Sequence, residues 1–131
     1  MTKKDFTHLD KATGNPAMVD VGEKKLTQRF AKASCKVVLG KEIMQSLNDN
    51  SELITKKGPV FQTAIIAGTM GAKKTAELIP LCHPLGMDDC KVTIEAIGEE
   101  EILITCTTKV TGKTGVEMEA MTGASVGALT I

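Results

Sequence analysis

His83 is the first residue whose surroundings suggest chemistry. It lies in the segment Leu81-Cys82-His83-Pro84, which follows Pro80. A histidine held between two prolines in a stiff turn is suited to proton transfer or to ligand contact. Taken alone, the segment is explained equally well by a hydrogen-bonded loop histidine. A zinc site built from Cys82, His83 and Cys90 is a weaker alternative, because no fourth ligand has a recognisable spacing.

A second segment, Thr111-Gly112-Lys113-Thr114-Gly115, lies between a predicted strand and a predicted helix. Glycines and unpaired backbone N–H groups at the start of a helix favour an anion, and Lys113 adds positive charge. A nucleotide-phosphate loop would need glycine five residues before Gly112, where the sequence has Thr107. A nucleotide hydrolase is therefore disfavoured, while an ordinary glycine-rich helix cap stays open as an alternative to an anion site.

Glu117 and Glu119 follow in the first turn of the next predicted helix, where acidic side chains complement the helix dipole. Two positions in a helix are separated by about 200° around its axis, so we expect the carboxylates to point to different sides. They are not expected to form a paired acid–base dyad. If both serve a site, they serve different parts of it, or one reaches a neighbouring subunit.

The composition excludes several classes of protein. The 131 residues include 16 basic and 16 acidic side chains and only three aromatic residues, all Phe. A zero net charge argues against non-specific DNA binding, and few aromatics argue against stacking on single strands. No apolar run approaches the roughly 20 residues that cross a bilayer. Residues 1–10 lack a signal-peptide core, and four cysteines without CxxC spacing favour free thiols. We therefore expect a cytoplasmic protein without nucleic-acid or membrane partners.

Basic residues also occur in local clusters despite the zero net charge. Such clusters usually form a solvated face, and they would build an anion site only if the fold brings them together. The clusters are Lys24, Lys25 and Arg29; Lys56 and Lys57; and Lys73 and Lys74.

Hydrophobic periodicity predicts the elements that must position these residues. Residues 1–32 are expected to form an irregular arm. Strands are predicted at 34–39, 90–97 and 101–110, and helices at 41–47, at 60–79 and from 116 onward.

The order of these elements predicts the fold class. Gly98 and Glu99 give a tight connection, so the last two strands should form an antiparallel hairpin. Within the long helix, Gly68 and Gly71 each cost about 1 kcal/mol relative to Ala, which implies close backbone packing. We therefore expect one α+β domain over 1–131, a ferredoxin-like split βαβ sandwich. It would have an antiparallel sheet with helices on one face and lack the last strand.

Two longer stretches together resemble the cyclic pyranopterin monophosphate synthase family of molybdenum cofactor biosynthesis. They are Leu78-Ile79-Pro80-Leu81-Cys82-His83-Pro84-Leu85 and Thr111-Gly112-Lys113-Thr114-Gly115-Val116-Glu117-Met118-Glu119-Ala120. Shorter matches extend the likeness over nearly the whole chain: Thr7-His8-Leu9, Met18-Val19-Asp20-Val21, Lys57-Gly58 and Ala72-Lys73-Lys74-Thr75.

The resemblance implies a phosphorus–oxygen lyase acting on 3′,8-cyclised dihydroguanosine triphosphate. The reaction rearranges this substrate into a pyranopterin, closes a cyclic phosphate and releases pyrophosphate. No redox cofactor and no protein-bound metal are implied, although Mg²⁺ can accompany the triphosphate. The resemblance also implies a homohexamer, a trimer of dimers, with the active site at a subunit interface.

The same resemblance assigns roles to individual residues. Lys57 and His83 would transfer protons, and Glu117 would orient a partner or the base. The substrate-contact segments comprise Leu81, Cys82, His83, Met118 and Glu119. The triphosphate oxygens would be held by Arg29, Lys73 and Lys113.

The end of the sequence departs from the family pattern. In the family, the helix containing Ala128-Leu129-Thr130-Ile131 continues into an Asp-x-x-Lys step with a catalytic aspartate, and a Lys-Ser-Gly-Gly segment follows. We therefore expect a longer natural chain, for which an intact mass well above 13.9 kDa would be the sign. A protein ending at Ile131 would be compromised in folding and inactive, which leaves a non-catalytic binding or scaffold subunit as the alternative function.

Overall fold

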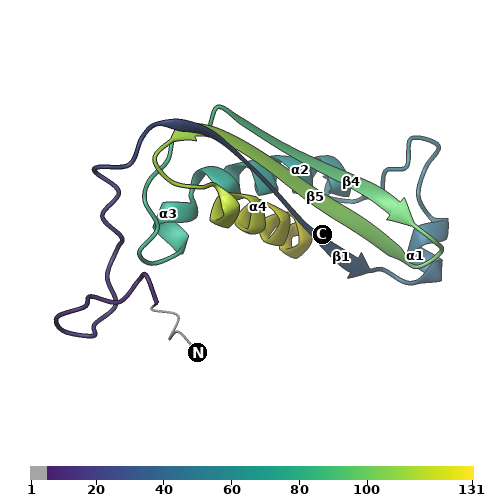
Figure 1. The fold of residues 1–131 in the computed structure, drawn as a ribbon. Helices are drawn as coiled ribbons and strands as arrows, with labels where there is room; N and C mark the ends of the chain where they lie inside the picture. The colour runs from purple at the N-terminus through teal and green to yellow at the C-terminus, as the bar shows by residue number, and fades with distance from the viewer. Residues whose placement is uncertain (1–5) are drawn as a thin grey trace.

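A three-stranded antiparallel sheet, covered on one face by helices, forms the body of the protein in the computed structural model, which describes residues 6–131 (Figure 1). Its strands are β1 (Thr27–Val38), β4 (Asp89–Ile97) and β5 (Glu101–Gly112). Both neighbouring pairs in the order β1-β5-β4 are antiparallel, so β1 and β4 run parallel with β5 between them. The α+β class and the antiparallel sheet with helices on one face are thereby confirmed.

Six further elements complete the described part of the chain. They are α1 (Lys41–Gln45), β2 (Ile54–Thr55), β3 (Gly58–Pro59), α2 (Val60–Lys73), α3 (Thr75–Leu78) and α4 (Glu117–Thr130). Strands β2 and β3 form a small separate hairpin, which the sequence patterns did not predict. Within residues 6–131, no helix is long and apolar enough to span a membrane.

The predicted arm over residues 1–32 was too long at its carboxyl end. Strand β1 begins at Thr27, which pairs with Gly112, and the pairing continues to Val38 opposite Glu101. The polar sequence from Thr27 onward has little strand propensity of its own. Pairing with the buried central strand stabilises it as a strand. Residues 1–5 of the predicted arm lie outside the described residues.

The predicted single helix over 60–79 is also corrected, because it ends at Lys73 and resumes as α3. The Thr75 hydroxyl donates hydrogen bonds to the carbonyls of Ala72 (2.9 Å) and Gly71 (3.5 Å). A threonine that bonds back to the preceding turn competes with the regular helix ladder. The break between the two helices is at Lys74, whose φ is −106° and ψ is 13°.

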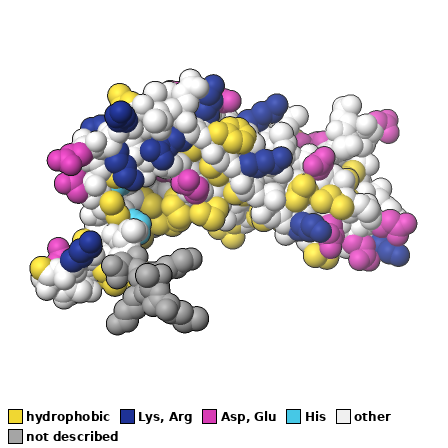
Figure 2. All heavy atoms as spheres, in the orientation of Figure 1, with side chains coloured by type: hydrophobic (Ala, Val, Ile, Leu, Met, Phe, Trp, Pro, Cys, Tyr) yellow, Lys and Arg dark blue, Asp and Glu magenta, His cyan; other side chains and the backbone are white. Residues whose placement is uncertain are grey.

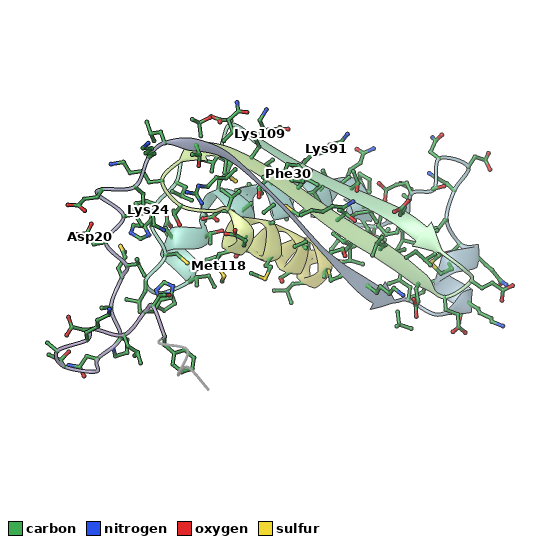
Figure 3. All side chains as sticks on the ribbon, viewed as in Figure 1. Asp20, Lys24, Phe30, Lys91, Lys109 and Met118 are labelled. Atoms are coloured by element: carbon green, nitrogen blue, oxygen red, sulfur yellow. The ribbon has the colours of Figure 1, made fainter. Side chains whose placement is uncertain are left out.

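Alternation along β5 decides which face of the sheet is the core. Ile102, Ile104, Cys106 and Val110 are buried and face α2 and α4, because successive strand residues point to opposite faces. The opposite face carries Phe30, Lys91 and Lys109, all of which are exposed, and no helix covers it in the described structure (Figure 3).

Helices α2 and α4 meet at their backbones, as the two glycines in the predicted helix implied. A Cβ atom on Gly68 would lie 2.7 Å from the carbonyl oxygen of Gly123, and one on Gly71 would lie 2.7 Å from Val126 Cγ2. On the facing helix, a Cβ atom on Gly123 would lie 2.5 Å from Cys106 Sγ. These distances leave no room for a side chain, so the glycines set the spacing of the two helices.

The molecule has two distinct ends, joined by α2 (Figure 1). At one end, the backbone N–H groups of Leu39 and Gly40 donate to the Glu100 carbonyl, so α1 lies beside the β4–β5 turn. The β2–β3 hairpin lies at this same end, whereas α3 and the arm lie at the other (Figure 1). A helix of 14 residues is about 21 Å long, which sets the separation of the two ends.

Replacing Gly68 by Ala should destabilise the protein by about 2 kcal/mol, because the steric cost of overpacking exceeds the gain in helix propensity. Gly127→Ala is the matched control, since its Cβ atom would meet Ile104 Cγ2 at an ordinary 3.5 Å. The control should keep or raise the unfolding midpoint in urea. Equal midpoints for the two variants would contradict the close contact.

Candidate active site

Hydrogen bonds bring the His83 segment and the glycine-rich loop to the same end of the sheet. The Thr111 hydroxyl donates to Asp88 Oδ2 at 2.9 Å, and the Asp88 N–H donates to the Lys109 carbonyl at 2.8 Å. Within β5, the buried Thr108 hydroxyl donates to the Val116 carbonyl at 3.0 Å and holds the loop that follows the strand against it. Both segments are therefore fixed to the end of β5.

A hollow of about 150 Å³ opens between these segments. Its lining comes from the arm, from the segment after α3 and from the beginning of α4. The lining residues are His8, Leu81, Cys82, His83, Leu85, Thr114, Gly115, Glu117, Met118 and Glu119. The structure thus gathers His83 and all the predicted contact residues of the two segments at one place. Met118 and the arm residue Lys24 lie at this end of the molecule (Figure 3), where Figure 2 shows histidine beside apolar side chains.

Leu81 adopts a backbone conformation that is unusual for a residue with a side chain. Its φ is 65°, in the left-handed region that favours glycine. Such a conformation costs of the order of 1 kcal/mol and persists only where the surroundings enforce it. The strained residue directly precedes Cys82 and His83, so the strain is located where the chain turns to present both side chains to the hollow.

Glu119 is a buried carboxyl group within the lining, with 4% of its surface exposed. Burial raises its pKa, a backbone hydrogen bond opposes this, and the nearby charge of Glu117 raises the pKa further. Among residues 6–131, Glu119 Oε2 has no hydrogen-bond partner. Burial also raises the pKa of the Cys82 thiol, with a smaller contribution from Glu119. Proton binding at Glu119 is thus more favourable than at an exposed glutamate, and deprotonation of the Cys82 thiol is less favourable than that of an exposed cysteine.

Glu117 and Glu119 line the same hollow, although helix geometry predicted different sides. Glu117 is the first residue of α4, and its carboxylate folds back against Gly115, where a Cβ atom would collide with it. The angular spacing of residues in a regular helix does not fix where a side chain at the first helical residue points when it folds back over the preceding loop. An exposed and a buried carboxyl group thus share one lining, which agrees with the expectation that they would serve different parts of a site.

The three basic residues predicted to bind phosphates lie near this end but not in the same hollow. Arg29 Nη2 donates to the Lys113 carbonyl at 3.4 Å, and Lys113 Nζ donates to the Gly22 carbonyl of the arm at 3.0 Å. Arg29 Nε is buried without a partner among the described residues. Lys73 lines an adjacent hollow of about 110 Å³, which it shares with Glu119.

Lys57 is the predicted site residue that lies farthest along the chain's fold from the hollow, at the opposite end of α2. It lies in the turn between β2 and β3 and is exposed. That hairpin precedes α2, whereas His83 follows the other end of the same helix (Figure 1). The two side chains are thus separated by the length of α2, about 20 Å.

His8 belongs to the lining although sequence reasoning gave it no role. Its loop is held by Asp10, whose Oδ1 accepts hydrogen bonds from the N–H groups of Ala12 and Thr13. The Ala17 N–H also donates to the His8 carbonyl at 2.7 Å. The only sequence signal was its place in the short match at Thr7-His8-Leu9, which does not indicate a partner far along the chain.

The weaker zinc alternative finds no support in the described part of the chain. Among residues 6–131, no group of three or more His, Cys, Asp or Glu side chains is arranged to hold a metal ion. Cys90 lies instead beside Cys106, with 3.9 Å between their sulfur atoms. All four cysteines are free thiols.

Comparison with known proteins agrees with the family resemblance of the segments that line the hollow. The MoaC family model matches residues 18–131. The chain belongs to the MoaC family. A cyclic pyranopterin monophosphate synthase of Xanthomonas campestris pv. campestris (strain 8004) is 48% identical over 130 residues, covering 99% of this chain and 78% of the relative.

Other MoaC-family relatives are similar to a comparable degree. A cyclic pyranopterin monophosphate synthase of Campylobacter jejuni subsp. jejuni serotype O:23/36 (strain 81-176) is 48% identical over 127 residues, covering 96% of this chain and 78% of the relative. A molybdenum cofactor biosynthesis bifunctional protein of Synechocystis sp. is 50% identical over 130 residues, covering 96% of this chain and 37% of the relative.

Glu119→Gln should stabilise the protein by about 1 kcal/mol at pH 7, by relieving the burial of an unpaired carboxyl group. A raised pKa means that the folded state keeps this proton to higher pH than the unfolded state, so stability falls as pH rises above the ordinary value of 4.5. The advantage of Glu119→Gln should therefore vanish below that pH. Thermal unfolding against pH measures this, with the exposed Glu95→Gln on β4 as the control. An advantage independent of pH would contradict the assignment.

Proposed function

We propose that this MoaC-family protein is a cyclic pyranopterin monophosphate synthase. It would convert 3′,8-cyclised dihydroguanosine triphosphate to cyclic pyranopterin monophosphate and release pyrophosphate. The observation that carries this proposal is the hollow in which His83, Glu117 and Glu119 lie together. Ring rearrangement and phosphate closure both require proton transfers, and such a cluster of titratable groups can provide them.

The roles of the lining residues follow from their chemistry. We assign proton transfer to His83 and Lys57, and substrate contact to Leu81, Cys82, Met118 and Glu119. The buried Glu119 carboxyl group can donate a hydrogen bond to a polar heterocycle or accept one from it. This role is supported by its Oε2, which has no partner among residues 6–131. Glu117, exposed at the first turn of α4, would orient a partner or the base.

We assign the triphosphate to Arg29, Lys73 and Lys113. Cationic side chains bind phosphate oxygens with strong charge-assisted hydrogen bonds and stabilise a pyrophosphate leaving group. The buried and unpaired Nε of Arg29 supports a ligand role, because buried guanidinium donors are normally satisfied. Lys73 and Glu119 both line the adjacent hollow. The residues assigned to the phosphates therefore lie next to those assigned to the heterocycle.

We propose that a second protomer completes the site. A hollow of about 150 Å³ is smaller than the roughly 300–1,000 Å³ of typical ligand pockets, and Lys57 lies at the far end of its own protomer. Exposed apolar side chains on the helices, Leu78, Met121 and Leu129, are suited to a subunit contact. A homohexamer built as a trimer of dimers would let Lys57 of one protomer face His83 of another.

The remaining assignments are also proposals. The order β1-β5-β4 is compatible with a ferredoxin-like split βαβ fold, and we treat residues 1–131 as one synthase domain. We place the enzyme in the cytoplasm, with a small-molecule substrate and no nucleic-acid or membrane partner. The reaction as proposed transfers no electrons, so it needs no redox cofactor, and Mg²⁺ can accompany the triphosphate.

Lys57→Ala in the full-length protein should abolish turnover without changing the unfolding midpoint, because Lys57 is exposed and its loss leaves the core intact. Turnover is followed by pyrophosphate release and by the fluorescent pterin obtained on oxidation of the product. Wild-type rates in Lys57→Ala would remove Lys57 from the mechanism. Phosphate release from ATP would instead indicate a hydrolase, and the absence of both reactions in the wild type would indicate a scaffold.

Co-expression of Lys57→Ala with His83→Ala tests whether two protomers share the site. Random pairing in a symmetric dimer with two shared sites leaves about a quarter of the sites with both residues intact. The mixture should therefore recover about a quarter of the wild-type rate, whereas each variant alone stays inactive. A mixture no more active than its components would contradict a shared site.

A further inference from the structure

The hairpin that carries Lys57 is attached to α2 by one buried carboxylate. Glu52 precedes β2 and is 7% exposed. Its Oε1 accepts hydrogen bonds from the N–H groups of Leu53 (2.8 Å) and Phe61 (2.7 Å), and its Oε2 accepts one from Gln62 N–H (3.0 Å). A single side chain therefore joins the segment before the hairpin to the helix that follows it.

This carboxylate takes the place of an ordinary helix cap. The residue before α2 is Pro59, which provides no side-chain cap, so the first N–H groups of α2 need an acceptor from elsewhere. Negative charge at a helix N-terminus is also stabilised by the helix dipole. Glu52 itself is held by Asn48, whose Oδ1 accepts the Glu52 N–H at 3.0 Å. The attachment is thus built from several mutually supporting bonds.

A second side chain fixes the turn itself. The Thr55 hydroxyl accepts a hydrogen bond from the Lys57 N–H at 3.2 Å and donates one to the Gly58 carbonyl at 3.3 Å. Gly58 has a φ of 103°, which a residue with a side chain rarely adopts. The Lys57 backbone is therefore hydrogen-bonded to the strand before the turn. Gly58, the next residue, closes the turn.

We propose that Glu52 and Thr55 are positioning residues for Lys57: Glu52 fixes the base of the hairpin on α2, and Thr55 fixes the turn that carries the lysine. This inference rests on the proposed role of Lys57 in proton transfer. Each strand of this hairpin has only two residues, and so short a hairpin has little stability of its own. An exposed lysine on it would otherwise sample many positions.

Thr55→Val tests the turn with little risk to folding, because Thr55 is exposed and Val keeps the branched shape while removing the hydroxyl. In the full-length protein we expect kcat to fall about tenfold, since small displacements of a catalytic group are costly, while KM changes little. Thr55→Ser restores the hydroxyl and should recover most of the lost kcat. Glu52→Gln should lower kcat further and also lower the unfolding midpoint.

Matched controls separate positioning from general damage. Thr107→Val removes a hydroxyl that donates to the Lys91 carbonyl on the sheet, away from the hairpin. Glu42→Gln removes one exposed negative charge from α1 at the same end as the hairpin. Both should keep the wild-type kcat. Rates are compared well below every unfolding midpoint, so that loss of folded protein does not contribute.

The outcomes are distinct. A loss of kcat in Thr55→Val and Glu52→Gln, rescued in Thr55→Ser at nearly constant KM, supports positioning. Unchanged kcat in Thr55→Val, or an equal loss in Thr55→Ser, overturns it even if Glu52→Gln is impaired. Wild-type and Lys57→Ala proteins are assayed in the same series. If the wild type does not turn over the substrate, the proposed function fails. If Lys57→Ala is fully active, the proposed role of Lys57 fails.

Discussion

The close backbone packing of α2 against α4 is the constraint on which the rest of the structure depends. Gly68, Gly71 and Gly123 leave no space for side chains, so the two helices have one permitted spacing over the sheet. That spacing fixes both ends of α2. Its beginning carries the Lys57 hairpin through Glu52, and its end leads through α3 to His83. One helix therefore sets the distance between the two proposed proton-transfer residues.

Three energetically costly features lie at the end of the sheet that forms the hollow. Leu81 has a positive φ, and among residues 6–131 one carboxylate oxygen of the buried Glu119 and the buried Nε of Arg29 have no hydrogen-bond partner. Native proteins retain such features mainly where function requires them, because each one costs stability. At the opposite end of α2, Ser51 also has a positive φ of 56°. The neighbouring Glu52 carboxylate accepts three backbone hydrogen bonds, which suits an attachment better than a binding surface.

The sequence predicted the parts of the fold that depend on local pattern. Alternation gave the β4–β5 hairpin, and glycine spacing gave the packed face of α2. It missed the start of β1, which depends on pairing with β5, and the break at Lys74, which interrupts a continuous helical pattern. The site segments were predicted, but the His8 contact and the attachment by Glu52 were not, because both join residues that no periodic pattern relates.

A structure of the full-length protein with the cyclised guanosine triphosphate bound is the most direct test of a site shared between protomers. Lys57→Ala protein would prevent turnover during the measurement. The account predicts a ligand whose heterocycle lies against His83 and Glu119 of one protomer, with the β2–β3 turn of a second protomer beside it. A ligand enclosed by a single protomer, with every β2–β3 turn remote from it, would contradict the account.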